Sequence, residues 1–201
     1  MHSRTRGYLP HRVVSQATYF VTFRLADSLP ASVLLECERN TRSKLLTPSK
    51  EEFRRRYQEA MEQELDTSYG QCWLNHPQVA SVITNTIRYF NSERYELLAW
   101  TIMPNHVHVL LTLIADFSLS SILHSWKSFS AKKANQILGK TREFWQREYF
   151  DVLVTSERQF EFFLRYVLNN PVKAGLCNEI FQWPGTDCSE EMQAVAKRFF
   201  L

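Results

Sequence analysis

Two histidines stand one residue apart in the apolar stretch "MPNHVHVLL", residues 103–111. The β-branched and aliphatic residues of 107–113 predict a strand, and the Pro104-Asn105 pair before it predicts a turn. Because side chains alternate along a strand, His106 and His108 share one face, and the other face is the better candidate for the core. With Cα atoms about 6–7 Å apart, the two imidazoles could hold one divalent cation. The spacing favours this interpretation over a pair of hydrogen-bonded core histidines, and both stay open.

A second group of polar residues lies in "FEFFLRYVLNNPVKAGL", residues 160–176. Its apolar spacing predicts a helix capped at its start by Ser156. Tyr166 falls beside the apolar stripe, and Asn170 follows one turn further along the same side. Pro171 predicts a break or kink at Asn170. Composition alone favours structural roles, in which the tyrosine borders the core and the asparagine caps the turn that the proline begins.

Strands and helices that alternate along the chain must position these residues. Strands are predicted over residues 18–25, 94–102, 107–113 and 144–154, and helices are predicted to begin after residue 30 and near residues 49, 77, 118 and 156. The strands 94–102 and 107–113 form an antiparallel hairpin across the Pro104 turn. Such strands with crossing helices predict an α+β fold with the helices on one face of the sheet.

Two helical segments carry further expectations. Residues 26–75 read as a polar helical insertion after the first strand, with Ser49 and Glu52 forming a capping box. The helix of 118–138 is predicted to end at Gly139 and to pack through an apolar stripe. The members of that stripe are Leu119, Ile122, Trp126, Phe129 and Ile137.

Length and composition bound the class of protein. The 201 residues predict one domain, with 185–201 as a C-terminal tail, and 44% hydrophobic with 22% charged residues is ordinary for a globular protein. The sequence has no apolar run of 18 residues or more and no signal-like start, so we expect a cytoplasmic protein without a membrane span. Its four cysteines form no C-x-x-C pair, which predicts reduced thiols.

Basic residues gather in short clusters although the net charge is only +3. Such clusters are more often solvated helix faces than nucleic-acid sites, but they could also contact phosphates. The candidates for DNA contact are the expected mobile arm of Arg4, Arg6 and Arg12, the helix residues Lys127, Lys132 and Lys133, and Lys173.

Three segments in this order, "AWTIMPNHVHVLL", "FWQREYFDVLV" and "YVLNNPVKAGL", resemble the REP-associated tyrosine transposases. These are single-tyrosine members of the HUH (His-hydrophobic-His) endonuclease superfamily, and the resemblance spans about residues 4–184. It implies a ferredoxin-like sheet bearing His106 and His108, a C-terminal helix bearing the nucleophile Tyr166, and a third metal ligand at Asn170. Relatives often carry Gly-Thr-Trp before the first strand, where this sequence has Ala17-Thr18-Tyr19.

The resemblance also implies an activity. The expected protein is a Mg²⁺- or Mn²⁺-dependent endonuclease and strand transferase that cleaves single-stranded DNA at hairpin-forming, REP-like inverted repeats. Cleavage would proceed through a 5′-phosphotyrosine intermediate, and a DNA 3′-hydroxyl would rejoin the strand. Two alternatives stay open: a hairpin-binding regulator without catalysis, and a metal-dependent phosphohydrolase that uses water. The sequence leaves open whether the protein is a monomer or a homodimer.

Overall fold

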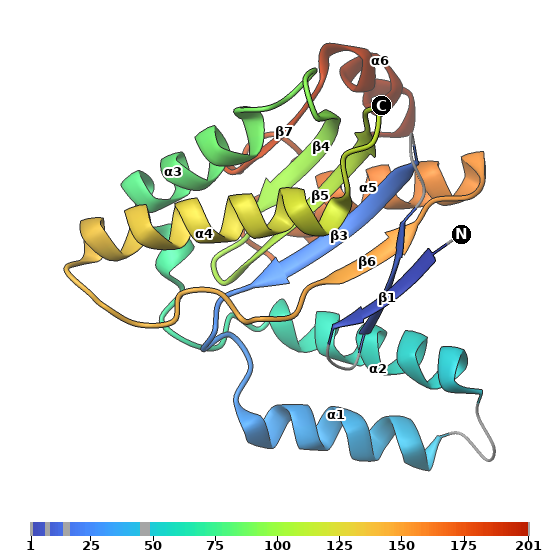
Figure 1. Cartoon of the computed structure of the whole chain (residues 1–201), viewed down its shortest axis with the longest axis vertical. Helices are drawn as coiled ribbons and strands as arrows, with labels where there is room; N and C mark the ends of the chain where they lie inside the picture. The colour runs from blue at the N-terminus through green and yellow to red at the C-terminus, as the bar shows by residue number, and fades with distance from the viewer. Residues whose placement is uncertain (1, 7–8, 14–16, 45–48, 201) are drawn as a thin grey trace.

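The computed structural model describes residues 2–6, 9–13, 17–44 and 49–200, and Figure 1 shows their arrangement. The strands are β1 His2–Arg6, β2 Leu9–Val13, β3 Thr18–Arg24, β4 Tyr95–Ile102, β5 His106–Leu113, β6 Phe150–Leu153 and β7 Thr186–Cys188. The helices are α1 Ala31–Ser43, α2 Lys50–Leu65, the short 3₁₀ turn η1 Trp73–Asn75, α3 Pro77–Arg88, α4 Leu119–Leu138, α5 Glu157–Lys173 and α6 Glu190–Phe200.

The central sheet has the strand order β6-β3-β5-β4-β7, and every neighbouring pair is antiparallel. When α1, α2 and the turn η1 are set aside, four of its strands and two helices follow one another along the chain as β3-α3-β4-β5-α4-β6. Counted along the chain, those strands lie in the spatial order 4-1-3-2, as in a ferredoxin-like βαββαβ unit. The predicted α+β fold with an antiparallel, ferredoxin-like sheet is therefore confirmed.

Helices cover both faces of this sheet, which corrects one detail of the prediction. The ferredoxin-like helices α3 and α4 lie together on one face, in front of the strands in Figure 1. The helix α5 packs on the opposite face with α6 beside it. The reason is that β3 and β5 alternate two apolar sets: Val21 and Val109 face α3 and α4, whereas Phe20 and Leu110 face α5. The face that carries the histidines is thus also covered.

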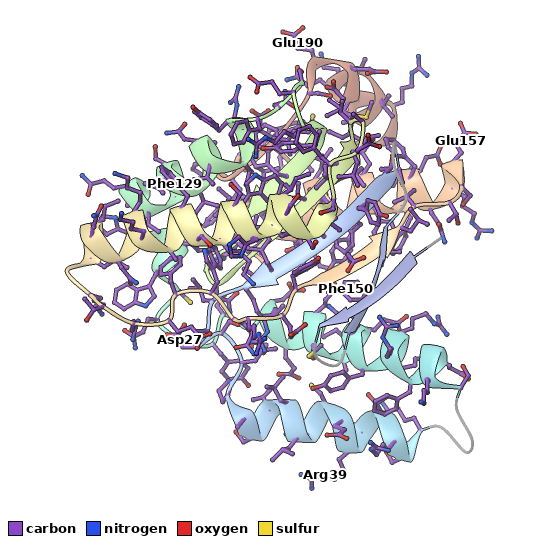
Figure 2. All side chains as sticks on the ribbon, in the orientation of Figure 1. Asp27, Arg39, Phe129, Phe150, Glu157 and Glu190 are labelled. Atoms are coloured by element: carbon purple, nitrogen blue, oxygen red, sulfur yellow. The ribbon has the colours of Figure 1, made fainter. Side chains whose placement is uncertain are left out.

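The core under α4 satisfies its polar groups internally. Trp126 is 2% exposed, and its indole N–H donates to the hydroxyl of Tyr95 at 3.0 Å. That hydroxyl in turn donates to the carbonyl of Ile87 at 2.7 Å. An unpaired donor at such a depth would cost about 1–3 kcal/mol. The expected stripe was too wide, because Phe129 is 54% exposed (Figure 2) and Ile137 is 37% exposed.

The predicted helical insertion is present as the pair α1 and α2, which lies below the sheet in Figure 1. The Ser49 hydroxyl accepts a hydrogen bond from the Glu52 amide at 3.1 Å, as the capping box predicted. The ends of the insertion meet, since the Gln71 amide donates to Asp27 at 3.2 Å. Gly70 has φ +86°, and a Cβ there would lie 2.5 Å from the Asp27 carbonyl oxygen, so this junction requires glycine.

Both ends of the chain are more regular than the sequence indicated. The strands β1 and β2 pair as an antiparallel hairpin that includes Arg4, Arg6 and Arg12, where we expected a mobile arm. Pairing satisfies backbone groups that a separate arm would leave to water. Residues 186–200, expected to be a tail, supply the edge strand β7 and helix α6, whose Met192 packs beneath α5.

The strand expected over residues 144–154 is shorter in the structure. Only Phe150–Leu153 forms β6, and Trp145 adds one isolated bridge to Leu25. In the interrupted segment, the ammonium of Lys127 binds the carbonyl groups of Gln146 and Arg147. All four cysteines are free thiols, as predicted. Within the described residues, no helix combines the length and the apolar character that crossing a membrane requires.

Candidate active site

The two histidines begin β5 and lie between the neighbouring strands of the sheet. His106 pairs with Arg24 of β3, and His108 pairs with Thr22 of β3 and Thr101 of β4. Their side chains are 1% and 0% exposed. The two Nε2 atoms face each other at 3.0 Å. The alternation of β5 thus places both rings on one face and brings their ring nitrogens together.

Hydrogen bonds to the other ring nitrogens orient the two imidazoles. Asn105 donates through its amide nitrogen to the Tyr69 carbonyl at 3.1 Å, which leaves its oxygen 2.7 Å from Nδ1 of His106. His106 therefore carries its proton on Nδ1 and presents an unprotonated Nε2. Nδ1 of His108 lies 2.8 Å from the hydroxyl of Thr22. When this hydroxyl donates to Glu62, 3.4 Å away, it accepts from Nδ1 and leaves the second Nε2 unprotonated too.

This arrangement fits a divalent cation. Two nitrogen ligands about 2.1 Å from one ion, at a right angle, are about 3.0 Å apart, which matches the separation of the Nε2 atoms. Burial, and next the charge of Lys173, lower the pKa of His106 to about 3. Burial, followed by the influence of His106 and Lys173, holds the pKa of His108 well below its ordinary value. Both rings are neutral at pH 7 and can act as ligands.

Asn170 supplies further support for a missing ligand. It is 1% exposed, and neither its side-chain oxygen nor its nitrogen has a hydrogen-bond partner within 3.5 Å, although its side chain lies near enough to Tyr166 to lower the pKa of that tyrosine slightly against the other effects. A buried amide without partners costs about 1–3 kcal/mol for each unsatisfied group, so such a group calls for an explanation. The alternative role as a cap of the Pro171 turn finds no support, because the side chain makes no hydrogen bond. The helix α5 also continues through Pro171 to Lys173, so of the break or kink that we expected at Asn170, a break is excluded.

Tyr166 lies one turn before this amide and packs between aromatic rings. Its ring centre is 5.1 Å from that of His108 and 5.5 Å from that of Phe20, both in edge contacts. The N-terminus of α5 is capped by Ser156, as predicted, which accepts from the Gln159 amide at 3.2 Å. The structure therefore brings the tyrosine that the sequence singled out against the histidine pair, with the predicted asparagine one turn further along α5.

One residue at this site was missed from the sequence, namely Glu62 of α2. Its Oε2 accepts a hydrogen bond from the hydroxyl of Tyr166 at 3.0 Å. Its Oε1 accepts from Gln58 at 3.3 Å and from Thr22 at 3.4 Å. The available signal was the spacing of Gln58, Glu62 and the buried Leu65 on one side of α2, which marks the side that faces the sheet.

Burial and two nearby carboxylates raise the pKa of the tyrosine. Burial raises the pKa of Tyr166 well above its ordinary value, and the negative charges of Glu62 and Asp66 raise it further. Burial also raises the pKa of Glu62, although its hydrogen bonds from Gln58 and Tyr166 oppose this change. Asp66 forms an ion pair with Lys173 at 2.9 Å. Two polar contacts thus join the insertion to the helix that carries the tyrosine.

The basic residues considered for DNA contact lie in different places. Lys173 adjoins the site, with its ammonium 5.8 Å from the ring centre of Tyr166. Lys132 and Lys133 are exposed on α4, across the sheet from the tyrosine. Lys127 donates to two backbone carbonyls at 2.7 and 2.6 Å, so binding a phosphate would require it to leave them. The side chains of the arginines in β1 and β2 lie outside the described structure.

Known proteins match this chain in both sequence and fold. The family described as "Transposase IS200 like" matches residues 65–170, more than half of the chain, and that segment holds the histidine pair, the tyrosine and the asparagine. A REP-associated tyrosine transposase of Escherichia coli (strain K12) is 26% identical over 91 residues, which are 45% of this chain and 52% of that protein. A relative from Haemophilus influenzae is 27% identical over 110 residues, 50% of this chain and 62% of its own length. The match thus spans less than two thirds of these curated relatives.

A solved structure of a REP-associated tyrosine transposase bound to a REP hairpin has the same fold. The TM-score is 0.52 with 18% sequence identity, and the match covers 100% of this chain and 88% of that chain. At this identity the similarity concerns the fold.

Proposed function

This chain belongs to the IS200-like transposase family, and on that basis we propose that it cuts and rejoins single-stranded DNA through a covalent bond to Tyr166. The observation that carries the proposal is the grouping of a partly buried tyrosine with two converging imidazole nitrogens, together with the buried amide of Asn170 one turn further along the same helix. The ring of Tyr166 lies 5.1 Å from that of His108, and the two Nε2 atoms lie 3.0 Å apart. A nucleophile beside a set of neutral donors is the composition that metal-assisted phosphoryl transfer needs.

His106, His108 and Asn170 would hold Mg²⁺ or Mn²⁺, since two imidazoles with an amide oxygen form a mixed donor set that leaves room for water and phosphate. When bound, the cation polarises the scissile phosphate and neutralises charge on its oxygens. Asn105 and Thr22 keep the ring nitrogens of the histidines oriented.

The covalent step follows from the position of the tyrosine. The oxygen of Tyr166 forms a bond to phosphorus, and the bond between phosphorus and the 3′-oxygen breaks. The products are a 5′-phosphotyrosine and a free 3′-hydroxyl. A DNA 3′-hydroxyl can reverse the step without ATP, because the phosphotyrosine bond conserves the energy of the original linkage.

We propose hairpin DNA with single-stranded flanks as the substrate, with REP-like inverted repeats as its class. A relative of the same fold was solved with a REP hairpin bound, which supports this choice. Single-stranded flanks are required because a duplex holds its backbone away from a partly buried tyrosine, whereas an unpaired strand can be threaded along the protein.

A covalent adduct tests the proposal. The substrate is a REP-type hairpin oligonucleotide with single-stranded flanks, labelled at its 3′ end and incubated with Mg²⁺ or Mn²⁺. We expect a labelled protein band on a denaturing gel for the wild type and for the control Tyr149→Phe, and none for Tyr166→Phe. The substitution removes one hydroxyl and little packing, so the loss would be chemical.

The other outcomes separate the two alternatives. Hairpin binding without cleavage by the wild type would identify a DNA-binding regulator. Cleavage that persists in Tyr166→Phe without any adduct would identify a phosphohydrolase that uses water. An adduct that persists in Tyr166→Phe but disappears in Tyr149→Phe would move the nucleophile to Tyr149, the residue before β6.

A further inference from the structure

The hydroxyl of Tyr166 is directed at a carboxylate from a distant part of the chain. Its Oη donates to Oε2 of Glu62 at 3.0 Å, across 104 positions of sequence. The carboxylate is anchored by Gln58, one turn earlier in α2, and by Thr22 of β3. These contacts direct one carboxylate oxygen at the hydroxyl proton of the proposed nucleophile.

A tyrosine in this position needs a proton acceptor. A free tyrosine titrates near pH 10 and is a poor nucleophile at neutral pH. In the structure its hydroxyl donates a hydrogen bond to a carboxylate, so the tyrosine keeps its proton there. The proton must therefore leave as the new bond forms, and a group within hydrogen-bond reach must accept it.

The neighbouring groups leave Glu62 as the acceptor. Both Nε2 atoms of the histidine pair face each other, and their Nδ1 atoms are engaged by Asn105 and Thr22. The other nearby carboxylate, that of Asp66, is paired with Lys173. Among the described residues, Glu62 is the hydrogen-bond acceptor that the structure places on the tyrosine hydroxyl.

We propose that Glu62 is a catalytic residue that accepts the proton of Tyr166 during cleavage and returns it during rejoining, an assignment that rests on the proposed function. In cleavage the O–H bond of the tyrosine breaks, its proton goes to Oε2 of Glu62, and the oxygen–phosphorus bond forms. The bond from phosphorus to the 3′-oxygen breaks, and that oxygen takes a proton from water. In rejoining, the 3′-hydroxyl gives its proton to water, and protonated Glu62 gives its proton to the departing tyrosine oxygen.

Two observations separate this role from metal binding and from the family pattern. Within the described part of the chain, no group of three or more His, Cys, Asp or Glu side chains is placed to hold a metal ion, so Glu62 does not join the histidine pair as a ligand. The family match begins at residue 65, and Glu62 lies before it, in the helical insertion. The insertion would then contribute directly to the chemistry.

The charges around the carboxylate suit a base. Tyr166 of α5 donates a hydrogen bond to Glu62. Asp66, one turn further along the chain, is paired with Lys173 of α5. Thr22 of β3 contributes a neutral hydroxyl. Burial raises the pKa of Glu62 above that of an exposed glutamate. A carboxylate whose pKa is raised toward 7 is a better general base at pH 7 than an ordinary one.

The test compares Glu62→Gln with Glu59→Gln, an exposed glutamate on the same helix. Glutamine keeps the size and an acceptor oxygen but cannot take a proton. We expect Glu62→Gln to slow both cleavage and rejoining at least about 100-fold, the lower range for general base catalysis, with hairpin affinity unchanged. Glu59→Gln should behave as the wild type. A change of less than about threefold in Glu62→Gln would overturn the proposal.

A second variant distinguishes a base from a structural support. In Glu62→Ala, added formate should restore part of the cleavage rate, because a small carboxylate can occupy the space that the side chain leaves. Rescue by formate but not by chloride at equal ionic strength supports proton transfer. Full folding of the alanine variant by circular dichroism, with no rescue at any formate concentration, argues for positioning alone and overturns the assignment.

A measurement on the resting protein does not require catalysis. With ¹³C at Cζ of tyrosine, and the signal of Tyr166 identified by Tyr166→Phe, the chemical shift should follow the ionisation of Glu62. We expect a titration step that disappears in Glu62→Gln, and its absence in the wild type would contradict the contact. A wild type that forms no adduct would refute the proposed function itself, whereas equal adduct formation by wild type and Glu62→Gln would refute only the role of Glu62.

Discussion

At the scale of single residues, the site combines groups that are costly to bury. Two neutral imidazoles, an amide without partners and a hydroxyl–carboxylate pair lie within one side of the sheet. Unpaired polar atoms at Asn170 cost stability in the free protein. A ligand that binds these atoms removes the destabilisation, so we expect the side chains of the site to become more ordered when a divalent cation and DNA bind.

The first prediction at this scale concerns the metal. His106→Ala and His108→Ala should each abolish adduct formation, and excess EDTA should do the same to the wild type, because each change removes one of the converging donors or the ion itself. Calorimetric titration with Mn²⁺ gives a readout that does not depend on activity, and both variants should lose binding. Undiminished cleavage in excess EDTA would remove the metal from the mechanism.

Asn170→Ala provides the graded comparison for the same prediction. Water can replace an amide oxygen on Mg²⁺ or Mn²⁺, so its loss should lower activity less than the loss of either histidine. If Asn170→Ala abolished both activity and Mn²⁺ binding as fully as His106→Ala does, the amide would be an essential ligand and not a replaceable one.

At the scale of elements, polar contacts fix two segments in place: the insertion is joined to α5, and the connection between α4 and β6 is held by a lysine of α4. The pair α1 and α2 reaches α5 through Glu62 and Asp66. The α4–β6 connection is held by Lys127, whose ammonium binds the carbonyls of Gln146 and Arg147. Burial lowers the pKa of this lysine to about 8, as expected for an amine engaged inside the fold.

Lys127→Met tests this structural role. The loss of two hydrogen bonds from a charged donor should lower the free energy of unfolding by about 1–3 kcal/mol, measured by urea denaturation, with little change in hairpin affinity. Lys133→Met is the matched control on the exposed side of the same helix, and its stability should be unchanged. If α4 contacts DNA, Lys133→Met should also reduce the salt dependence of hairpin binding: the slope of log K for binding against log salt should fall in magnitude by about 0.7–0.9.

The reverse pattern would assign the lysines differently. A Lys127→Met variant of wild-type stability that binds the hairpin more weakly would make this residue a phosphate contact. The connection between α4 and β6 would then be held by its other bonds, such as that from the Gln146 amide to the Arg24 carbonyl at 2.9 Å.

At the scale of the whole molecule, the sheet separates two surfaces. The histidine pair lies on the side of α5, which carries the tyrosine. The helix α4 with its exposed lysines covers the opposite face, and Figure 1 shows α4 and α5 on the two sides of the sheet. A single strand that reaches Tyr166 must pass the face formed by α5 and the insertion. A rigid duplex cannot bend into a buried site of this kind without losing base pairs.

This geometry predicts a preference for unpaired DNA. A hairpin with a single-stranded flank should bind more tightly than its perfect duplex, and the difference should persist as salt is raised, because electrostatic contacts to the backbone weaken in both forms. Fluorescence anisotropy from low to physiological salt measures both affinities. Equal affinities at every salt concentration would favour a duplex-binding protein over a single-strand transposase.

The local features of this protein follow from its sequence alone. The alternation of β5 placed His106 and His108 on one face, and the caps at Ser49 and Ser156 were recognised from short patterns. Tyr166 and Asn170 were paired by helical spacing. These features depend on neighbouring residues and on the fixed periods of strands and helices, so a linear pattern contains them. The chemical roles of these residues stay predictions.

Only the tertiary structure decided which distant groups meet. Glu62 lies 104 positions from Tyr166. Its spacing with Leu65 marks the sheet-facing side of α2, but no pattern in the sequence indicates that this carboxylate meets the tyrosine. The engagement of Lys127 with two carbonyls and the exposure of Phe129 were equally invisible, since both depend on how α4 meets the segment before β6. Packing between elements is set by many weak contacts at once, and a carboxylate finds its partner only after the insertion has docked against the sheet.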